Sequence, residues 1–320
     1  MAVAAQLIIP LNFYVLIFLF TTITLVLIIF IPYRKYAPIL KWLCLSLFAY
    51  PLTVFIVTQP WLTILKATFI PHFEFSFQFL FIITGVLGTT ISPYLFFWQA
   101  SQVVEEARAK KQIKDGKTNV TKASIRNLRI DNFVGMLSSQ VIAWSIIVVA
   151  ATVLHTNNIT DINTAADAAK ALEPLVQTFP NAGYIAKLIF AIGIIGLGLL
   201  AIPVLAGSAA YAISEAFDWQ NGLNLKFKKA YGFYGAIIIA SLIGVSINFV
   251  GINPIKALVY TAVINGVVAV PLIFILALIA RSKKIMGEHR SGLLSAIFVW
   301  LTFISMGIAA LAMFYTFIKG

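Results

Sequence analysis

The sequence predicts an all-α polytopic membrane protein with about eight transmembrane helices, forming a single transmembrane domain over residues 1–320. Of the 320 residues, 61% are hydrophobic and 11% are charged, whereas an average soluble chain has about 25% charged residues. The apolar residues also gather into stretches of roughly 20 residues, the length that a helix needs to cross a bilayer. The short alternating segments of a membrane β-barrel are absent.

The predicted spans follow one another along the whole chain. Most of them are apolar on all faces, as expected of helices that contact lipid and one another. The fifth stretch is too long for one perpendicular crossing, so we expect it to tilt, to kink at Pro203 or to extend into water. A short amphipathic helix is expected before it, around Ala165–Leu172. The spans lie at about 10–32, 37–58, 76–103, 132–154, 183–217, 231–250, 254–280 and 291–318.

The net charge of +12 reflects membrane topology rather than binding to nucleic acid. One set of alternate loops carries 18 of the 23 lysines and arginines, and the opposite set carries five. Loops rich in these cations face the cytoplasm. We therefore expect a multi-pass protein of the cell (plasma) membrane that has the lipid bilayer as its partner and both termini of this chain on the outer side. The sequence does not indicate an oligomeric state.

This orientation makes the N-terminus unusual. The segment Met1–Gln6 is apolar and carries neither a cation nor a cleavage signal, although it would have to cross the membrane. We therefore expect further segments upstream of Met1. The single cysteine, Cys44, excludes an intrachain disulfide and a thiolate metal cluster, and we expect it to be a small buried apolar side chain.

Ionisable side chains are informative by their positions. None lies near the middle of any predicted span, where such groups usually mark function. The three histidines, His72, His155 and His289, lie in loops and lack metal-ligand spacing. No Ser/His/Asp arrangement, paired carboxylates or glycine-rich phosphate loop can be assembled. The sequence therefore predicts neither an enzyme nor a bound cofactor.

The third span contains an unusual segment, Gly85–Tyr94, with the sequence GVLGTTISPY. A proline inside a helix removes a backbone hydrogen bond and pushes the preceding residue toward extended geometry. We expect Pro93 to break the helix and Ser92 to cap the second half. Backbone opened at this depth lines protein or a wet cavity, and the carbonyl end of the first half would suit a cation. The alternative is a simple proline kink, with Thr and Ser bonding back to carbonyls.

Other polar residues are candidates for lining a central cavity. Asn265 lies mid-span, six residues before Pro271, and its alternative role is a hydrogen bond between helices. Thr90, Tyr94 and Gln99 lie at the break or follow it. The small residues of the fifth span are explained by close helix packing.

The segment Gly88–Tyr94 resembles the sixth transmembrane helix of the NRAMP family of divalent metal-ion transporters, which carries Ala-x-x-Met-Pro-His there. Residues 183–217 resemble the eighth helix of that family, and Pro271 with Arg281–Glu288 resembles its tenth helix and the following loop. The resemblance implies a partial LeuT-like inverted-repeat fold, in which the eight spans correspond to helices four to eleven. The first three helices, including the Asp-Pro-Gly-Asn segment that supplies ligands in the family, have no counterpart here.

The resemblance also implies a metal site. Aligning the prolines places Thr89 at the Ala position, which binds through its backbone carbonyl, and Ser92 at the Met position. These two residues would form half a site. Oxygen ligands suit hard ions such as Mg²⁺, and Tyr94 replaces a His that can titrate near neutrality. The pattern is similar to a divergent branch associated with Mg²⁺, so Mg²⁺ or Mn²⁺ is favoured over Fe²⁺ and proton coupling is expected to be lost.

The implied function is secondary transport of divalent metal ions by alternating access, with the ion at the unwound segment Thr89–Tyr94. If this chain were the whole protein, half of the site would be missing and we would expect no transport. Two alternatives stay open. One is a LeuT-like amino-acid transporter that binds a carboxylate near Ser92–Tyr94, and the other is a non-transporting membrane fragment or scaffold.

Overall fold

The computed structural model describes most of the chain. Cys44 and much of the first part of the predicted span 37–58 lie outside the described residues. The described residues are 1–320 without 32–34, 36, 37, 39–41, 43, 44, 71, 110–112, 115, 116, 119, 120, 159–161, 163, 178, 179, 224 and 320.

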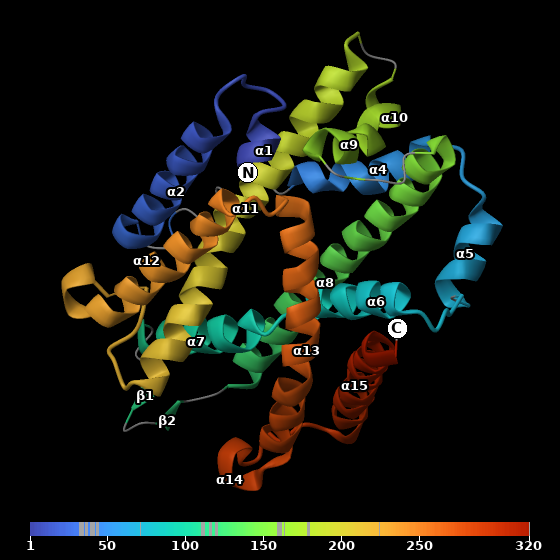
Figure 1. The fold of residues 1–320 in the computed structure, drawn as a ribbon. Coiled ribbons are helices and arrows are strands. Elements are labelled where there is room, and N and C mark those ends of the chain that lie inside the picture. The colour runs from blue at the N-terminus through green and yellow to red at the C-terminus, as the bar shows by residue number, and fades with distance from the viewer. Residues whose placement is uncertain are drawn as a thin grey trace. The chain divides into compact units, whose positions relative to one another are not determined.

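Seven helical segments among the described residues are long and apolar enough to cross a membrane. They match seven of the eight predicted spans and confirm an all-α polytopic membrane protein (Figure 1). The remaining prediction, 37–58, is described as a shorter apolar helix, Leu45–Ile56. The long segments are α2 (Phe13–Phe30), α6 (Phe77–Thr90) with α7 (Tyr94–Ala109), α8 (Lys122–Val149), α11 (Ala182–Ala216), α12 (Tyr231–Ser246), α13 (Pro254–Arg281) and α15 (Leu293–Lys319).

Short elements connect the long helices. The described strands are one antiparallel pair, with two residues in each strand. The short elements are α1 (Ala2–Ala5), η1 (Leu45–Phe48), α4 (Ala49–Ile56), α5 (Trp61–Phe69), β1 (Ile113–Lys114), β2 (Lys117–Thr118), the π-helix η2 (Ala150–Leu154), η3 (His155–Asn157), α9 (Ala165–Ala169), η4 (Lys170–Leu172), α10 (Glu173–Val176), η5 (Phe227–Lys229), η6 (Ile247–Phe249) and α14 (Lys283–Met286).

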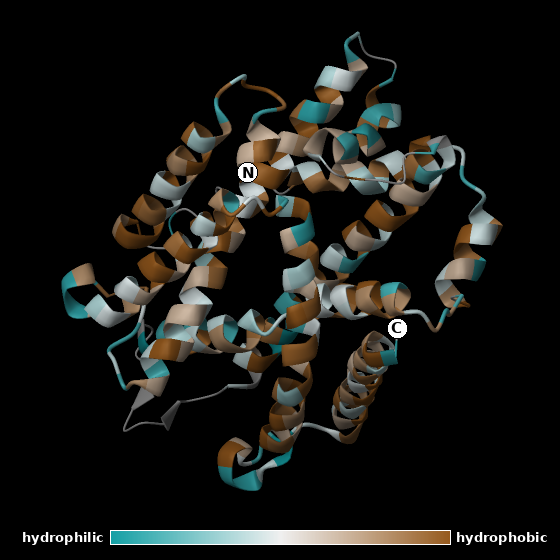
Figure 2. Ribbon diagram, viewed as in Figure 1, coloured by the Kyte–Doolittle hydropathy of each residue, from teal (hydrophilic) through white to brown (hydrophobic). Residues whose placement is uncertain are grey.

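The long helices present apolar side chains outward. Figure 2 shows hydrophobic residues along α13 and α15 and hydrophilic ones around α14. Large side chains such as Phe18 (76% exposed), Phe55 (77%) and Ile318 (82%) are uncovered. Apolar surface of this extent does not face water in a stable protein. It is the surface that lipid covers.

The structure divides into two compact units. The first comprises Met1–Ile70 and Ala100–Ser246, and the second comprises Pro71–Gln99 and Ile247–Gly320. Helix α7 therefore begins in the second unit and ends in the first.

The first unit is built around α11, which contacts α1, α2, α10 and α12. This helix runs as one element of 35 residues past Pro203. Its small residues permit close packing, as predicted: a Cβ placed on Gly193 would lie 2.6 Å from the hydroxyl oxygen of Ser46. Helix α4 packs against α8 beside this core.

The predicted amphipathic helix at Ala165–Leu172 is confirmed as α9 followed by η4. A capping box starts it, in which the hydroxyl of Thr164 accepts from the backbone N–H of Asp167 and the Asp167 carboxylate accepts from that of Thr164. The hydrogen bond from the Thr164 hydroxyl, aided by Lys170, lowers the pKa of Asp167 below its usual value. The cap satisfies backbone donors that a short helix leaves open.

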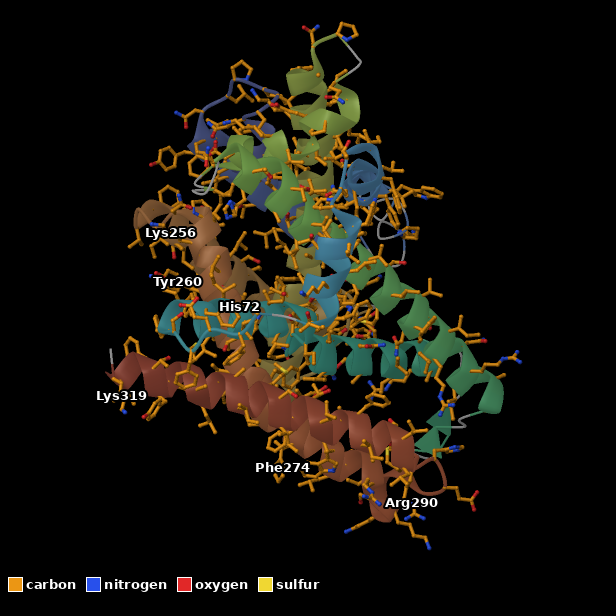
Figure 3. All side chains as sticks on the ribbon, turned by 90° about the vertical axis from the view of Figure 1, so that its right-hand side faces the viewer. His72, Lys256, Tyr260, Phe274, Arg290 and Lys319 are labelled. Atoms are coloured by element: carbon orange, nitrogen blue, oxygen red, sulfur yellow. The ribbon has the colours of Figure 1, made fainter. Side chains whose placement is uncertain are left out.

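In the second unit, α13 contacts both α6 and α15. Apolar side chains fill the space between these helices, including Leu80 from α6, Val263 from α13 and Met313 from α15. Lys256 and Lys319 lie at one end of the α13–α15 pair and Arg290 lies at the other (Figure 3). The two helices therefore run antiparallel, and the basic loop between them is at the end opposite Lys319.

Candidate metal site at a broken helix

The third predicted span is interrupted as expected. Helix α6 ends at Thr90, and α7 begins at Tyr94. In the first turn of α7, the N–H of Leu95 donates to the carbonyl of Ser92 and that of Phe96 to the carbonyl of Pro93, each at 3.1 Å. Proline supplies no N–H and disfavours helical geometry in the residue before it. The local chemistry of Pro93 therefore explains where the helix stops.

The hydroxyl of Ser92 belongs to the first half of the broken helix. Ser92 is 3% exposed, and its Oγ donates to the carbonyl oxygen of Gly88 at 2.7 Å and lies 3.3 Å from that of Thr89. The expectation that this side chain caps the second half is therefore wrong. The end of a helix leaves carbonyls without intrahelical partners, and a buried hydroxyl one turn away satisfies them.

The two threonines turn their hydroxyls back along α6. Thr89 Oγ1 and Thr90 Oγ1 both donate to the carbonyl of Val86, at 2.8 and 3.1 Å. What Thr89 offers at the break is therefore its backbone carbonyl, the group expected to bind an ion there. These hydrogen bonds are also those of a plain proline kink.

Two glycines set the distance between α6 and α13 beside the break. A Cβ placed on Gly88 would overlap with the carbonyl oxygen of Ala262 and the backbone of Gly266, and one placed on Gly266 would overlap with the carbonyl of Thr84. In the structure, Gly88 permits close contact between the two helices. Gly266 was missed, although a glycine in the middle of a span is the usual signal for such packing.

The remaining candidates lie around this crossing. Asn265 is half-buried and directly precedes Gly266. Thr90, Tyr94 and Gln99 are also half-buried and belong to the same unit. The structure thus gathers them along the break and the helix that packs against it, and their role in lining a cavity stays a prediction.

A second polar cluster, which the sequence did not reveal, holds the far end of α7. Tyr211 of α11 is 1% exposed; its hydroxyl donates to the carboxylate of Glu105 and accepts from the side-chain amide of Gln102 at 3.0 Å. The N–H of Leu223 also donates to Glu105, at 3.0 Å. We call Gln102, Glu105, Tyr211 and Leu223 the Tyr211 cluster.

The backbone before Leu223 adopts a glycine conformation that brings this residue into the Tyr211 cluster. Gly222 has φ +141°, a conformation that only glycine adopts readily, and a Cβ there would lie 2.9 Å from the Glu105 carboxylate. Gln102 and Glu105 are three residues apart and so share one face of α7. That spacing is the sequence signal that was available, but it does not name the partner on α11.

Comparison with known proteins decides the family. Residues 1–316 match the sequence model of Nramp, natural resistance-associated macrophage protein-like. The chain belongs to the Nramp family. The predicted resemblance is thereby confirmed, and it covers almost the whole chain.

Two bacterial relatives of the chain are named as divalent metal cation transporters. The chain is 28% identical over 240 residues to the divalent metal cation transporter MntH of Caldanaerobacter subterraneus subsp. tengcongensis, covering 75% of this chain and 51% of that protein. It is 25% identical over 264 residues to the MntH of Bacillus subtilis, covering 82% and 55%. The chain spans about half the length of the curated relatives it matches.

In a relative of metal-ion transporters, the residues that could bind a metal ion are of interest. In the part of the chain that the structure describes, no group of three or more His, Cys, Asp or Glu residues is placed to hold a metal ion. The oxygens at the break, from the carbonyls of the α6 end and the hydroxyl of Ser92, stay predicted ligands.

Proposed function

We propose that the protein is a secondary transporter of divalent metal ions that works by alternating access, with the ion bound at the break between α6 and α7. The observation that carries this proposal is a helix interrupted in an apolar span, with carbonyl oxygens and a buried serine at the interruption, in a member of the Nramp family. Broken helices are where secondary transporters bind substrate.

The proposed ligands are the carbonyl oxygen of Thr89 and the carbonyl or hydroxyl oxygen of Ser92. The hydroxyl of Ser92 uses its proton on the carbonyls of Gly88 and Thr89, and the oxygen keeps lone pairs for a cation. Two oxygens leave a hexacoordinate ion with open positions, which water or groups elsewhere in the protein would fill.

We propose Mg²⁺ or Mn²⁺ as the transported ion. Carbonyl, hydroxyl and water oxygens suit these hard ions, whereas thioether and thiolate ligands favour softer ones. The relatives carry the general name of divalent metal cation transporters, which agrees with either ion. At the position of Tyr94 the family has a His that can titrate near neutrality. Its replacement by Tyr supports transport without proton coupling at this position.

The proposed orientation places the basic loops in the cytoplasm of a cell with this protein in its plasma membrane. The strongly basic loop that contains Arg290 lies at the end of α13 and α15 opposite Lys256 and Lys319 (Figure 3), which supports an asymmetric distribution of cations. Positive loops remain on the cytoplasmic side during insertion. The Tyr211 cluster, at the basic end of α7, would then fix the inner half of the broken helix to α11.

Calorimetric titration of the purified full-length protein tests the substrate class. Mg²⁺ and Mn²⁺ are expected to bind, and amino acids such as leucine and glycine are expected not to bind. Saturable binding of an amino acid without either ion would support the LeuT-like alternative instead, and binding of neither class would support the scaffold.

A substitution at the Met position of the family tests the ligand assignment. Ser92→Met places a soft thioether beside the Thr89 carbonyl, so the ratio of Mn²⁺ or Cd²⁺ affinity to Mg²⁺ affinity is expected to rise by about tenfold or more. Thr90→Met, which changes a neighbour outside the proposed ligand pair, is the matched control. An equal change in both variants would contradict the role of Ser92.

A further inference from the structure

A groove of about 460 Å³ lies between the end of α13 and the start of α15, within the second unit. Arg281 stands at one end of it and Ser305 is its farthest residue along α15, while Leu293, Ile297, Leu301 and Ile304 form its apolar wall. The proposed metal site uses none of these residues. We call it the Arg281 groove.

The apolar wall has the length of one lipid leaflet. Leu293, Ile297, Leu301 and Ile304 are each more than half exposed and recur every three or four residues along one face of α15. From Leu293 to Ser305 the helix rises about 18 Å at 1.5 Å per residue, slightly more than half of a hydrocarbon core of about 30 Å. A single acyl chain laid along this wall would reach roughly the middle of the bilayer.

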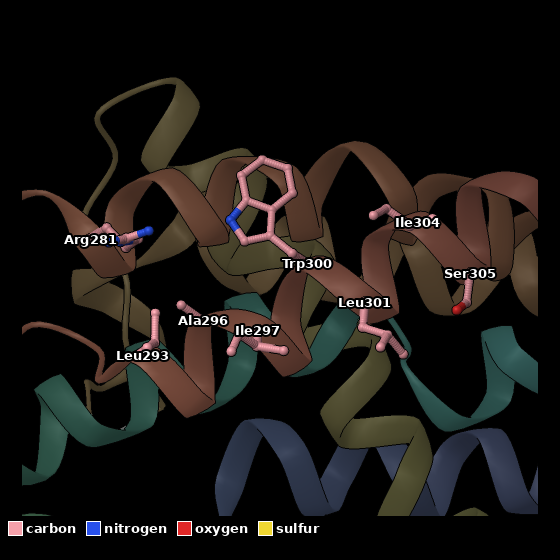
Figure 4. Close-up of a pocket in the computed structure, with 8 residues that line it drawn as sticks. All are labelled: Arg281, Leu293, Ala296, Ile297, Trp300, Leu301, Ile304 and Ser305. Carbon is pink, nitrogen blue, oxygen red and sulfur yellow. The ribbon is translucent and has the colours of Figure 1, made fainter.

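Two hydrogen-bond donors, Arg281 and Trp300, also line the groove. Figure 4 shows the guanidinium of Arg281 and the indole nitrogen of Trp300 turned toward the same space. The Trp300 ring is held edge-on by Phe274 and Phe303, with centroids 5.9 and 5.6 Å away. The indole N–H and the guanidinium donate and never accept. The pair is therefore suited to an acceptor such as a phosphate oxygen.

The surrounding charge selects an anionic headgroup. The segment Arg281–Arg290 contains four cations and one carboxylate, Glu288, and its residues Arg281, Lys283, Lys284 and Arg290 are exposed. Basic pockets between membrane helices on the cytoplasmic side attract anionic lipid headgroups. A zwitterionic headgroup would bring a cation into the same basic surroundings.

We propose that the Arg281 groove is a binding site for one anionic phospholipid, with an acyl chain along Ile297, Leu301 and Ile304 and the phosphate at Arg281 and Trp300. A second copy of the chain would need an interface of about 1,000 Å² or more, much larger than this narrow groove. A free phosphate ion would leave the apolar wall unused. The site depends only on the membrane fold and not on the transported ion.

Native mass spectrometry of the detergent-purified protein with added lipid tests this proposal. Phosphatidylglycerol is expected to bind as one tight equivalent, and phosphatidylcholine of the same chain length is expected to bind at least about tenfold more weakly. Arg281→Ala should weaken phosphatidylglycerol binding by about tenfold. Lys284→Ala removes the same charge from the same loop outside the groove and should change it less than threefold, a limit drawn from the small value of exposed charges.

A second variant tests the contribution of the apolar wall separately from that of the cations. Ile297→Trp fills the apolar wall and leaves every cation in place, so tight phosphatidylglycerol binding should be lost while the protein stays monodisperse on gel filtration. Equal binding of the two lipids, equal losses in Arg281→Ala and Lys284→Ala, or full competition by inorganic phosphate would overturn the proposal. A lipid-free dimer in the mass spectrum, in which a second copy of the chain covers the groove, would also overturn it.

Discussion

At Ser92, one buried hydroxyl determines which half of the broken helix receives a hydrogen bond. It donates to the carbonyl of Gly88 rather than accepting from α7, because the carbonyls at the end of α6 lack intrahelical partners and Ser92 is buried beside them. The position of the break could be predicted, since Pro93 acts through its own ring and its direct neighbour. The direction of the Ser92 side chain could not, since it depends on burial that only the tertiary structure creates.

The donor assignment at the break makes a first prediction. Ser92→Ala removes a proposed ligand and the hydrogen bonds to the α6 carbonyls, so Mg²⁺ or Mn²⁺ affinity should fall by about tenfold or more. Thr89→Val removes a hydroxyl but keeps the carbonyl, and should leave the affinity within about twofold. Titration calorimetry measures both; an equal loss in the two variants would mean that hydroxyls alone carry the binding.

At the scale of the helices, α6 and α13 cross in close contact beside the break. Contact through Gly88 and Gly266 brings the two backbones together, as small residues do in membrane helices. The length and composition of the apolar stretches predicted both helices and their approximate ends. It did not predict which glycines meet, because a helix that is apolar on all faces carries no mark of the face that packs.

The crossing makes a second prediction. Gly266→Ala places a methyl group against the carbonyl of Thr84 and should lower the free energy of unfolding by about 1–3 kcal/mol. Gly135→Ala, on α8 where a Cβ meets nothing within 4 Å, should instead leave it unchanged or raise it by about 0.5–1 kcal/mol. Unfolding in mixed detergent micelles measures both, and matching losses would refute close packing at Gly266.

The Tyr211 cluster makes a third prediction at this scale. Tyr211→Phe removes the hydroxyl that joins Gln102 and Glu105, so the unfolding free energy should fall by about 1–2 kcal/mol because polar groups lose their partner. Tyr231→Phe, at a tyrosine of α12 that is 60% exposed, should change it by no more than about 0.5 kcal/mol. Equal stabilities of the two variants would show that the cluster contributes nothing.

For the whole molecule, composition and charge predicted most of the membrane architecture. Seven of the predicted spans recur as helices of spanning length, because the hydrocarbon thickness imposes one length and one composition on each of them. The contacts that build each unit were not predictable in the same way. The partner of Glu105 lies more than a hundred residues away on α11, and no local pattern encodes that distance.

The topology makes a fourth prediction. In a Cys44→Ser background, Lys319→Cys should react with a membrane-impermeant maleimide added to intact cells, because it is expected outside. Arg290→Cys should react only after permeabilisation, since the basic loop is expected in the cytoplasm. The two positions lie at opposite ends of the second unit, so the reverse labelling pattern would invert the proposed orientation.

Uptake of Mg²⁺ and Mn²⁺ by the full-length protein in proteoliposomes tests most directly the claim that a divalent ion crosses the membrane at the broken helix. We predict saturable uptake of at least one of these ions, reduced by about tenfold or more in Ser92→Ala and nearly unchanged in Thr89→Val. Absence of uptake of both ions, or uptake that Ser92→Ala leaves intact, would contradict it.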